Sequence, residues 1–590
     1  MTINNDGKKL PELLAPAGSR EAAIAAVRGG ADAIYLGGTM LNARMNAKNF
    51  GDDEMRDTIA FCHENGVFVY VTLNTAVYDR ELSEALDYVG FLYTAGVDGL
   101  IVADLGLASL IRRFYPMLPL HASTQASGHS VACAEKLREL GFCRMVCARE
   151  LSREETDRLC AESPIETEQF VHGALCVSQS GQCLASAMIG GRSGNRGACA
   201  QPCRMQYNGG YPLSLKDSSL APYVPELIKS GVASLKIEGR MKSPAYVYGV
   251  VSVYRRLLDE GRAASEAEMK RLAELFSRGG FTDGYYTSRI DDEMNGIRSD
   301  GDKLATARAT SIQDSAFEGK GKNNQTQSVC RAPIIIPERA RNDEAKYTVK
   351  RRQANAKKSK KPIFTARFAS AGQVVKDDML SIIYLPLDKF EPDCGANGVV
   401  FPPTIFDRDL ERAERCMREA RDAGAEHALV CNIGHVELAK KYGFIIHGDY
   451  RLNIFNSETA NLYMAQGMRD VMLAPELTLP QIRDINAPKC AVVYGRIPLM
   501  LLTKPVGARS LKDRTGASFP VVREFGYDVM LNSVPFYMAD KQKELDTYDV
   551  RGRHLFFTTE SRKECAEIIA RFKRGEASAS AAGSIRRIPR

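Results

Sequence analysis

The sequence lacks the features that mark membrane proteins, secreted proteins and two large classes of hydrolase. No apolar run approaches the roughly 18 residues that a membrane-spanning helix needs, and the first residues, MTINNDGKKL, contain no apolar signal core. The motifs His-Glu-x-x-His and Gly-x-Ser-x-Gly are also absent, which removes the usual patterns of zinc proteases and serine hydrolases. We therefore expect a cytoplasmic protein that does not enter a membrane.

The composition is that of a soluble globular protein with several domains. The 590 residues, 44% hydrophobic and 26% charged, suggest two to four domains. A net charge of +7 is mild for this length and supports an RNA partner only weakly. Without a signal peptide, the 15 cysteines are interpreted as reduced thiols, some of them ligands, rather than as a disulfide framework.

Four of these cysteines lie in one polar, glycine-rich stretch, residues 168–204. They are Cys176, Cys183, Cys199 and Cys203. Thiolates bind soft metals and iron–sulfur clusters, and glycine allows a backbone to fold closely around such a centre. Buried cysteines that act as small hydrophobes are the simpler alternative, but the stretch is too polar for a core element. We predict that the four thiols converge on a metal centre.

The spacing of the four cysteines bears on which metal they hold. Structural zinc sites usually bring their ligands in pairs about two to four residues apart, and only Cys199 and Cys203 meet that spacing. A 4Fe–4S cluster is larger and accepts more open loops. The spacing therefore favours a 4Fe–4S cluster, with zinc as the alternative.

Residues 10–260 alternate short apolar runs with helical patterns. The runs are Glu12–Ala17, Ala33–Leu36, Val67–Leu73, Gly99–Ala103, Leu118–Ala122, Arg144–Ala148, Gln169–Val171 and Ser234–Ile237. About eight such units in series predict an α/β fold, a TIM-like (β/α) barrel with a parallel sheet. In these barrels the working residues lie where strands end and loops begin, so we expect the cysteine-rich stretch to lie over the barrel mouth.

Several polar residues fall at the predicted strand ends and are candidates for catalysis. They are Asn42, Arg44, His172, Lys236, Glu238 and Arg240. The basic members are suited to phosphate or carboxylate, the glutamate to orienting a substrate or transferring protons, and the histidine to acid catalysis. A structural ion pair or a satisfied polar group at the barrel end is the alternative for each.

Residues 363–575 repeat the first barrel, which indicates an internal duplication. The matched positions are Asp104–Gly106 with Asn432–Gly434, His121 with His447, Glu150 with Glu476, and Val171–Gly173 with Val493–Gly495. The second copy has no counterpart of the four-cysteine stretch, so we expect a degenerate barrel-like repeat without the metal centre. Because His121 and Glu150 persist in that copy, we expect them to serve the fold.

The remaining segments connect or extend the two copies. We divide the chain into a first barrel (1–262), a helix with a turn-rich tail (263–300), a basic linker or remnant small domain (301–362), the second copy (363–575) and a disordered tail (576–590). The run Lys350–Lys361 is typical of a solvated linker, and the alternative is an arm that contacts RNA phosphates.

The cysteine-rich stretch resembles the signature of the collagenase-like peptidase family, peptidase family U-32. The matching residues are Glu168, Phe170, Gly173, Ala174, Leu175, Cys176, Gly181, Cys183 and Ser186, followed by Asn195, Arg196, Gly197, Cys199, Gln201, Pro202, Cys203 and Arg204. Ala185 departs from the pattern, at a position where a larger aliphatic residue is usual. The resemblance extends into residues 263–300.

This resemblance implies a function. Several bacterial members of the family are iron–sulfur proteins that take part in hydroxylation of a cytidine in large-subunit ribosomal RNA, of a wobble uridine in transfer RNA, or of the ubiquinone ring. Prephenate has been implicated as their oxygen source. The longer, duplicated form resembles the members that act on ribosomal RNA, and so implies an RNA hydroxylase, with an electron-transfer partner as a further expectation.

Two other functions remain open from the sequence. The family name implies a peptidase, for which Cys176 would be the nucleophile and His172 its base, but one nucleophile leaves three cysteines unexplained. The other is a non-catalytic RNA-binding protein stapled by zinc.

Overall fold

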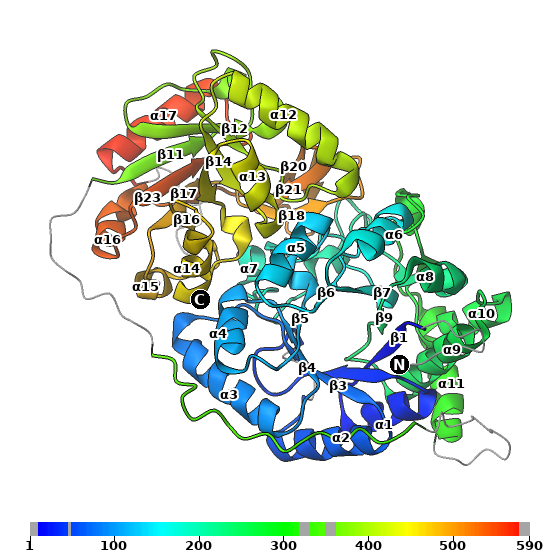
Figure 1. Cartoon of the computed structure of the whole chain (residues 1–590). Coiled ribbons are helices and arrows are strands. Elements are labelled where there is room, and N and C mark those ends of the chain that lie inside the picture. Colours follow the sequence, from blue (N-terminus) through cyan, green and yellow to red (C-terminus); the bar gives the residue numbers. More distant parts are fainter. Residues whose placement is uncertain (1–9, 45–48, 318–330, 349–360, 578–590) are drawn as a thin grey trace.

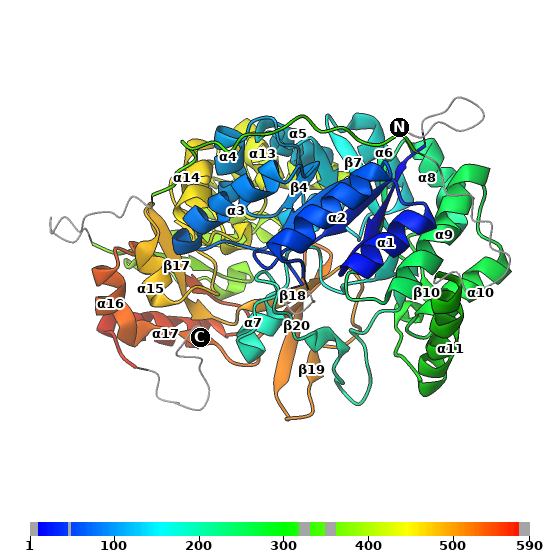
Figure 2. The same ribbon diagram turned by 90° about the horizontal axis from the view of Figure 1, so that it is seen from below.

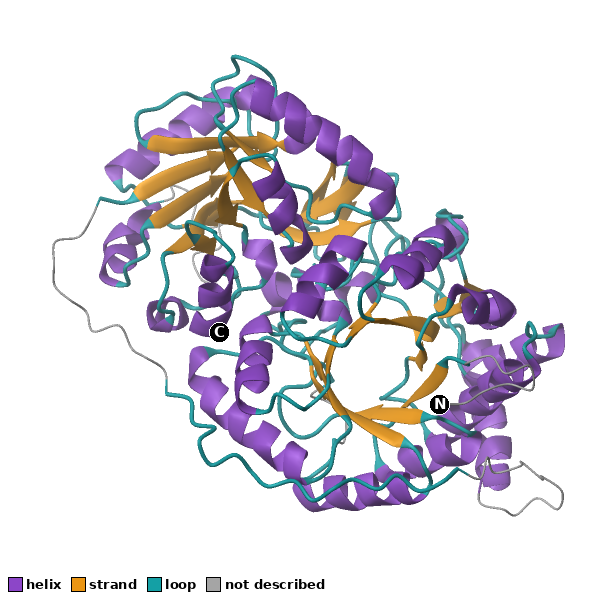
Figure 3. Ribbon diagram, viewed as in Figure 1, coloured by secondary structure: helices purple, strands orange, loops and turns teal. Residues whose placement is uncertain are grey.

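The computed structural model describes residues 10–44, 49–317, 331–348 and 361–577, and it contains two barrels that lie side by side (Figure 1). The basic run Lys350–Lys361 and the C-terminal tail, which the sequence singled out, fall almost entirely outside these residues. Figure 3 shows the first barrel nearly end-on, with its strands around a centre and its helices outside them.

The first barrel is a closed ring of eight parallel strands, which confirms the TIM-like fold. Its strands are β1 (Glu12–Pro16), β2 (Ala33–Leu36), β3 (Phe68–Leu73), β4 (Gly99–Val102), β5 (Leu120–Ala122), β6 (Arg144–Val146), β7 (Glu166–Ala174) and β9 (Ser234–Ile237). Each pairs with the next in this order, and β9 also pairs with β1 to close the ring. All eight predicted strands are present, because each apolar run is short, buried and bounded by turn residues.

Helices cover the outside of this ring. They are α1 (Arg20–Gly29), α2 (Asp52–Glu64), α3 (Leu82–Thr94), α4 (Leu105–Phe114), α5 (Val131–Glu139), α6 (Arg153–Glu162), α8 (Val224–Ser230) and α9 (Pro244–Glu260). Side chains that accept a hydrogen bond from the first turn fix where several of them begin, as Ser19 does for α1 and Ser130 for α5.

The second barrel repeats this plan, as the duplication predicted. Its ring consists of β11 (Ile363–Arg367), β12 (Leu380–Pro386), β13 (Gly398–Val400), β14 (His427–Val430), β15 (Ile445–Gly448), β16 (Val471–Met472), β17 (Lys489–Gly495) and β23 (Gly552–Phe556). Its helices are α12 (Leu410–Asp422), α13 (Val436–Lys441), α14 (Ser457–Ala465), α15 (Leu479–Asp484), α16 (Gln542–Thr547) and α17 (Arg562–Arg574). An antiparallel sheet of β18 (Pro498–Leu502), β19 (Ser510–Lys512), β20 (Ser518–Glu524) and β21 (Tyr527–Leu531) is inserted between β17 and β23.

One glycine is required at the same point of each ring. Gly173, near the end of β7, and Gly495, at the end of β17, both have positive φ, 105° and 134°. A side-chain carbon on Gly173 would lie 2.7 Å from the carbonyl oxygen of Glu238, and one on Gly495 would lie 2.2 Å from that of Phe556. The close approach of strands seven and eight therefore excludes any larger residue in either copy.

Matched residues of the two copies form the interface between the barrels. The carboxylate of Asp79 accepts a 2.9 Å hydrogen bond from the backbone N–H of Ser457, at the start of α14. Its counterpart Asp407 accepts a 3.4 Å bond from the N–H of Val131, at the start of α5. Each copy thus satisfies the free N–H groups at a helix N-terminus of the other, and the interface has approximate two-fold symmetry.

The segment between the barrels is partly ordered against them. Residues 301–317, which the sequence assigned to a linker, belong to helix α11 (Asp300–Phe317), which packs with α10 (Glu266–Leu275) and α9. Further along, Arg331 forms an ion pair with Asp32 at 2.7 Å, and the Tyr347 hydroxyl donates to Glu458 at 3.1 Å. The segment therefore fastens to both barrels.

Candidate functional site

The four candidate ligands lie in a long connection that leaves the first barrel after β7. This connection, residues 175–204, is called here the cysteine loop, and it contains one short α-helix, α7 (Ala185–Gly190). The chain returns through β8 (Asp217–Ser219), which pairs antiparallel with the end of β7. The loop therefore starts at the carboxyl end of a barrel strand, where TIM barrels carry their active sites.

The structure brings the four thiols within electrostatic reach of one another. Cys176 and Cys199 are exposed, whereas Cys183 and Cys203 are partly buried. Burial raises the pKa of the Cys203 thiol to about 12, with Arg204 opposing the rise and Cys176 and Cys199 adding to it. The pKa of Cys183 is raised in the same way, by burial and then by the other three thiols. A bound cation would relieve this mutual repulsion.

The thiols do not surround a point where one metal ion would bind. Within the described residues, no group of three or more His, Cys, Asp or Glu side chains is placed to hold a single ion. The arrangement of the cysteine loop is therefore more open than a structural zinc site.

Two equivalent glutamates hold the cysteine loop, one from each barrel. Glu150, which follows β6, accepts a 2.6 Å hydrogen bond from the N–H of Ser180. Glu476, which follows β16, accepts bonds from Ser193 Oγ at 2.7 Å and from Asn195 Nδ2 at 3.5 Å. Burial raises the pKa of Glu476 to about 7. In both copies this glutamate therefore holds the loop that carries the cysteines.

The inserted sheet of the second barrel also binds the cysteine loop. The N–H of Gln179 donates to Leu501 O at 2.7 Å, and the N–H of Leu184 donates to Leu499 O at 2.8 Å. Strand β18 therefore pairs with the loop on both sides of Cys183. This contact was missed from sequence, although a short buried run bounded by turn residues is the usual signal of a strand.

Two candidate residues form an ion pair at the mouth of the first barrel. Arg44 Nη2 lies 3.2 Å from Glu238 Oε1, and Arg149 Nη2 lies 3.7 Å from Glu238 Oε2. Burial alone would raise the pKa of Glu238, but these two guanidiniums and that of Arg240 hold it below its ordinary value. Glu238 is therefore ionised at neutral pH. Arg149 was missed from sequence, although it directly precedes Glu150 at a strand end.

Two further candidates join this group through hydrogen bonds. Arg240 donates to Thr72 Oγ1 at 2.8 Å and to Asn42 Oδ1 at 3.1 Å, and Asn42 Oδ1 also accepts from the N–H of Arg44 at 2.9 Å. Burial lowers the pKa of Arg240 to about 10, so it remains a cation at neutral pH. Asn42, Arg44, Glu238 and Arg240 thus converge.

The other two candidates lie in different surroundings. Lys236 Nζ lies 2.6 Å from Glu168 Oε1, and both side chains are buried. Lys236 thus forms a structural ion pair, the alternative that the sequence offered for each candidate. His172 packs among the rings of Tyr246, Tyr254 and Phe281, and burial lowers its pKa to about 3. Within the described residues no hydrogen bond joins His172 to Cys176.

A second group of cations lies around the ring of Phe276. Lys242 Nζ is 2.7 Å from the ring centroid, and the guanidinium carbons of Arg298 and Arg278 are 4.4 Å and 5.3 Å from it. Burial, aided by the two arginines and opposed by Asp217, lowers the pKa of Lys242 to about 7. With the arginines around Glu238, this side of the site favours anions.

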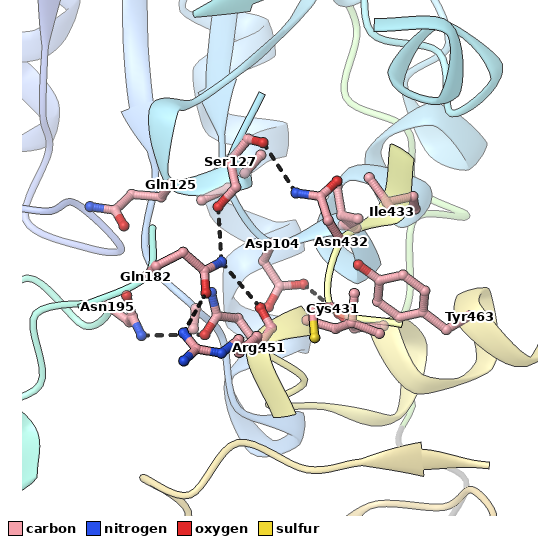
Figure 4. A pocket seen from close by; sticks show the side chains of 17 residues that line it. Asp104, Gln125, Ser127, Gln182, Asn195, Cys431, Asn432, Ile433, Arg451 and Tyr463 are labelled. Atoms are coloured by element: carbon pink, nitrogen blue, oxygen red, sulfur yellow. Dashed lines mark hydrogen bonds between the residues drawn. The ribbon is translucent and has the colours of Figure 1, made fainter. Parts of the chain in front are cut away.

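A cavity of about 50 Å³, lined by both polar and apolar residues, lies between the barrels beside the cysteine loop (Figure 4). Matched positions of the two copies line it, such as Ser127 and Asn453, together with Gln182 from the loop. The Gln182 amide donates to Ser127 Oγ at 3.1 Å and accepts from Arg451 Nη1 at 3.4 Å. Both barrels therefore contact the residue that directly precedes Cys183.

No helix among the described residues has the length and apolar character to cross a membrane.

Comparison with known proteins identifies relatives that match part of this chain. The chain is 39% identical over 268 residues to the tRNA hydroxylation protein P1 of Bacillus subtilis, covering 42% of this chain and 64% of that one. It is 42% identical over 261 residues to the 23S rRNA 5-hydroxycytidine C2501 synthase of Escherichia coli, covering 42% and 39%. A protein of Porphyromonas gingivalis named collagenase is 32% identical over 308 residues, covering 47% and 73%. The chain thus matches less than two thirds of the length of the first two relatives.

The family model of peptidase family U32 matches residues 18–296 and 399–496. These two segments contain most of the first barrel with its cysteine loop, and the second barrel from β13 to β17. The match therefore covers more than half of the chain and both copies of the repeat, and the protein belongs to peptidase family U32.

Proposed function

We propose that this protein hydroxylates a nucleobase in RNA, and that Cys176, Cys183, Cys199 and Cys203 hold a 4Fe–4S cluster. The observation that carries the proposal is the approach of all four thiols to one another at the mouth of a barrel rich in cations. The printed names of the Bacillus subtilis and Escherichia coli relatives support RNA hydroxylation, and the second supports ribosomal RNA as the substrate.

The thiols suit a cluster better than a single ion. Only Cys199 and Cys203 have the close spacing of a structural zinc site, whereas a 4Fe–4S cluster is larger and takes four thiolates at its corners. Iron bound to sulfur would also favour the ionised form of Cys183 and Cys203, whose pKa values are raised without it. The exposed Cys176 and Cys199 leave one side of such a centre open to a substrate.

The residues of the barrel mouth have clear roles in this proposal. Arg44, Arg149 and Arg240 bind an anionic group, either an RNA phosphate or the carboxylate of an oxygen donor such as prephenate. Glu238, ionised and paired with Arg44, keeps that guanidinium in place and accepts hydrogen bonds from a base. The cluster, when bound, supplies electron transfer or a Lewis acid at the reacting group, and an electron-transfer partner would serve the first of these.

Peptidase chemistry is the alternative that the name of the Porphyromonas gingivalis relative supports. A thiol nucleophile needs a nearby base that titrates near neutrality. His172, the base that the sequence offered, is buried among aromatic rings and has a pKa of about 3. The observations therefore favour the hydroxylase.

Metal analysis of protein purified without oxygen tests the proposal. We expect about four irons and four sulfides per chain with a broad visible absorption, and loss of both in the Cys176→Ala variant. Mass spectrometry of RNA from a strain without the gene should then show loss of one hydroxylated nucleotide. Zinc without sulfide would instead identify a zinc-stapled RNA-binding protein, and absence of both metals with rapid alkylation of Cys176 would revive the thiol peptidase.

A further inference from the structure

A hairpin of the second barrel projects beside the cysteine loop. Figure 2 shows β19 and the chain that follows α7 on the same side of the molecule. Asn208, five residues after Cys203, donates its N–H to Lys512 O at 2.9 Å, accepts from the N–H of Lys512 at 2.9 Å and donates its amide to Ser510 O at 3.0 Å. The hairpin of β19 and β20 is thus fastened to the chain just beyond the last cysteine.

The contacts that fasten the hairpin use its backbone and leave its basic side chains free. Arg509, Lys512 and Arg514 are all exposed, and within the described residues no ion pair engages any of the three. The nearby carboxylate of Asp513 accepts hydrogen bonds from the N–H groups of Thr515 and Ala517, at 2.8 Å and 3.1 Å, and so closes the turn of the hairpin. The hairpin therefore presents three exposed cations, spread from the start of β19 to the turn.

An exposed aromatic ring lies three residues after Asn208, the residue that is hydrogen-bonded to the hairpin, and Tyr207 before it pairs with Asp513 in the hairpin turn. Tyr211 is 39% exposed and follows the turn in which Tyr207 and Gly210 exchange backbone hydrogen bonds. Arg192, in the cysteine loop, is exposed as well. Proteins that bind single-stranded nucleic acid combine cations that follow the backbone with aromatic rings on which bases stack.

We infer that the β19–β20 hairpin binds the phosphate backbone of single-stranded RNA and directs a nucleotide to the cysteine loop. The inference rests on the proposed action on RNA and assigns the surface that holds the substrate. Unpaired cations beside an exposed ring fit phosphates and bases together, whereas an acidic peptide would use only the cations. The hairpin belongs to the second barrel, so the copy without the four cysteines supplies the substrate contact.

The binding of RNA to two charge-matched variants tests this assignment. The first combines Arg509→Ala, Lys512→Ala and Arg514→Ala, which keep the backbone contacts to Asn208. The second removes three exposed cations elsewhere in the second barrel, by Arg415→Ala, Arg418→Ala and Arg469→Ala. Affinity is measured by fluorescence anisotropy with a labelled single-stranded RNA of about 16 nucleotides, over a series of salt concentrations, and circular dichroism checks the fold of each variant.

We expect the hairpin variant to bind roughly tenfold to a hundredfold more weakly at about 0.1 M salt, with a slope of log affinity against log salt shallower by about 2. The control triple should change the affinity by less than about threefold, because its side chains contact no phosphate. Tyr211→Phe should retain most of the binding, and Tyr211→Ala should weaken it about fivefold or more with little change in slope, because stacking does not depend on counterions.

Three results would overturn the inference. Equal losses in the hairpin and control triples would show that only net charge matters. Equal affinity of the unchanged protein for RNA and for poly-glutamate would identify a general polyanion surface. Intact RNA binding by the hairpin variant, together with a normal hydroxylated nucleotide in its host strain, would place the substrate elsewhere while leaving the proposed hydroxylase in force.

Discussion

The two barrels differ most between their seventh and eighth strands. In the first barrel this connection is the cysteine loop, and in the second it is the antiparallel sheet β18–β21. The two insertions contact each other, since β18 pairs with the loop on both sides of Cys183. Duplication has therefore produced one copy that carries the candidate ligands and one that supports them.

The two equivalent glutamates contact the same loop at different points. Glu150 holds the loop from its own barrel, between Cys176 and Cys183, and Glu476 holds it from the other barrel, between Cys183 and Cys199. Because the interface has approximate two-fold symmetry, matched positions of the two copies face the same loop from opposite sides. We therefore expect substitutions in either barrel that remove contacts with the cysteine loop to affect the positions of its cysteines.

The largest expected effect is the loss of a cysteine in the first barrel. Cys183→Ser should reduce bound iron from about four atoms per chain to near zero and abolish RNA hydroxylation, because a hydroxyl is a poor ligand for a cluster. Cys416→Ser, in α12 of the second barrel, is the matched control and should retain iron and activity. Iron analysis of both variants decides, and full iron in the Cys183 variant would remove this residue from the ligand set.

Substitution of the matched glycines should destabilise both copies but affect only one function directly. Gly173→Ala and Gly495→Ala each press a methyl group against a backbone carbonyl at positive φ, at a cost of about 3 kcal/mol. We expect both variants to unfold at a lower temperature in calorimetry. Only Gly173→Ala should also disturb the arginines around Glu238, because the carbonyl that the new methyl group meets belongs to Glu238. Unchanged stability in either variant would contradict the close approach of the seventh and eighth strands.

Features of this protein could be predicted from the sequence where they leave a local pattern of residues. The eight strands of the first barrel could be predicted because each is a separate buried apolar run, and the duplication because matched residues such as Glu150 and Glu476 keep their order. The role of His172 in chemistry was a weaker prediction, since only tertiary packing decides that a polar residue next to a strand end faces Tyr254. Arg149 and the pairing of β18 with the loop depend on contacts between distant segments, which no local pattern records.

Removal of the hydrogen bonds that Glu476 of the second barrel accepts should make the cysteine loop more mobile. Glu476→Ala leaves Ser193 Oγ without its acceptor and removes one of the two acceptors of the Asn195 amide, at a cost of about 1–3 kcal/mol. We expect faster tryptic cleavage after Arg192 and Arg196, measured by mass spectrometry. Glu476→Gln keeps an acceptor and is the matched control, and equal cleavage of all three proteins would mean that the loop is held without Glu476, by contacts such as those of Glu150 and β18.

The smallest predicted effect is a pH dependence of the protein's stability, which arises from the ionisation of Glu476 in the second barrel. Burial raises the pKa of Glu476 to about 7, from 4.5 in an unfolded chain. The folded protein therefore keeps a proton that the unfolded chain has lost, and its stability falls as pH rises through the folded pKa, by about 1 kcal/mol between roughly pH 6 and pH 8. The Glu476→Gln side chain cannot ionise, so the free energy of unfolding of this variant should change less over this range. The variant should therefore become more stable relative to the unchanged protein as pH rises. Denaturant unfolding of both proteins at the two pH values measures the difference, and parallel behaviour would show that Glu476 is already ionised below pH 6, which would leave a charged carboxylate holding the loop throughout.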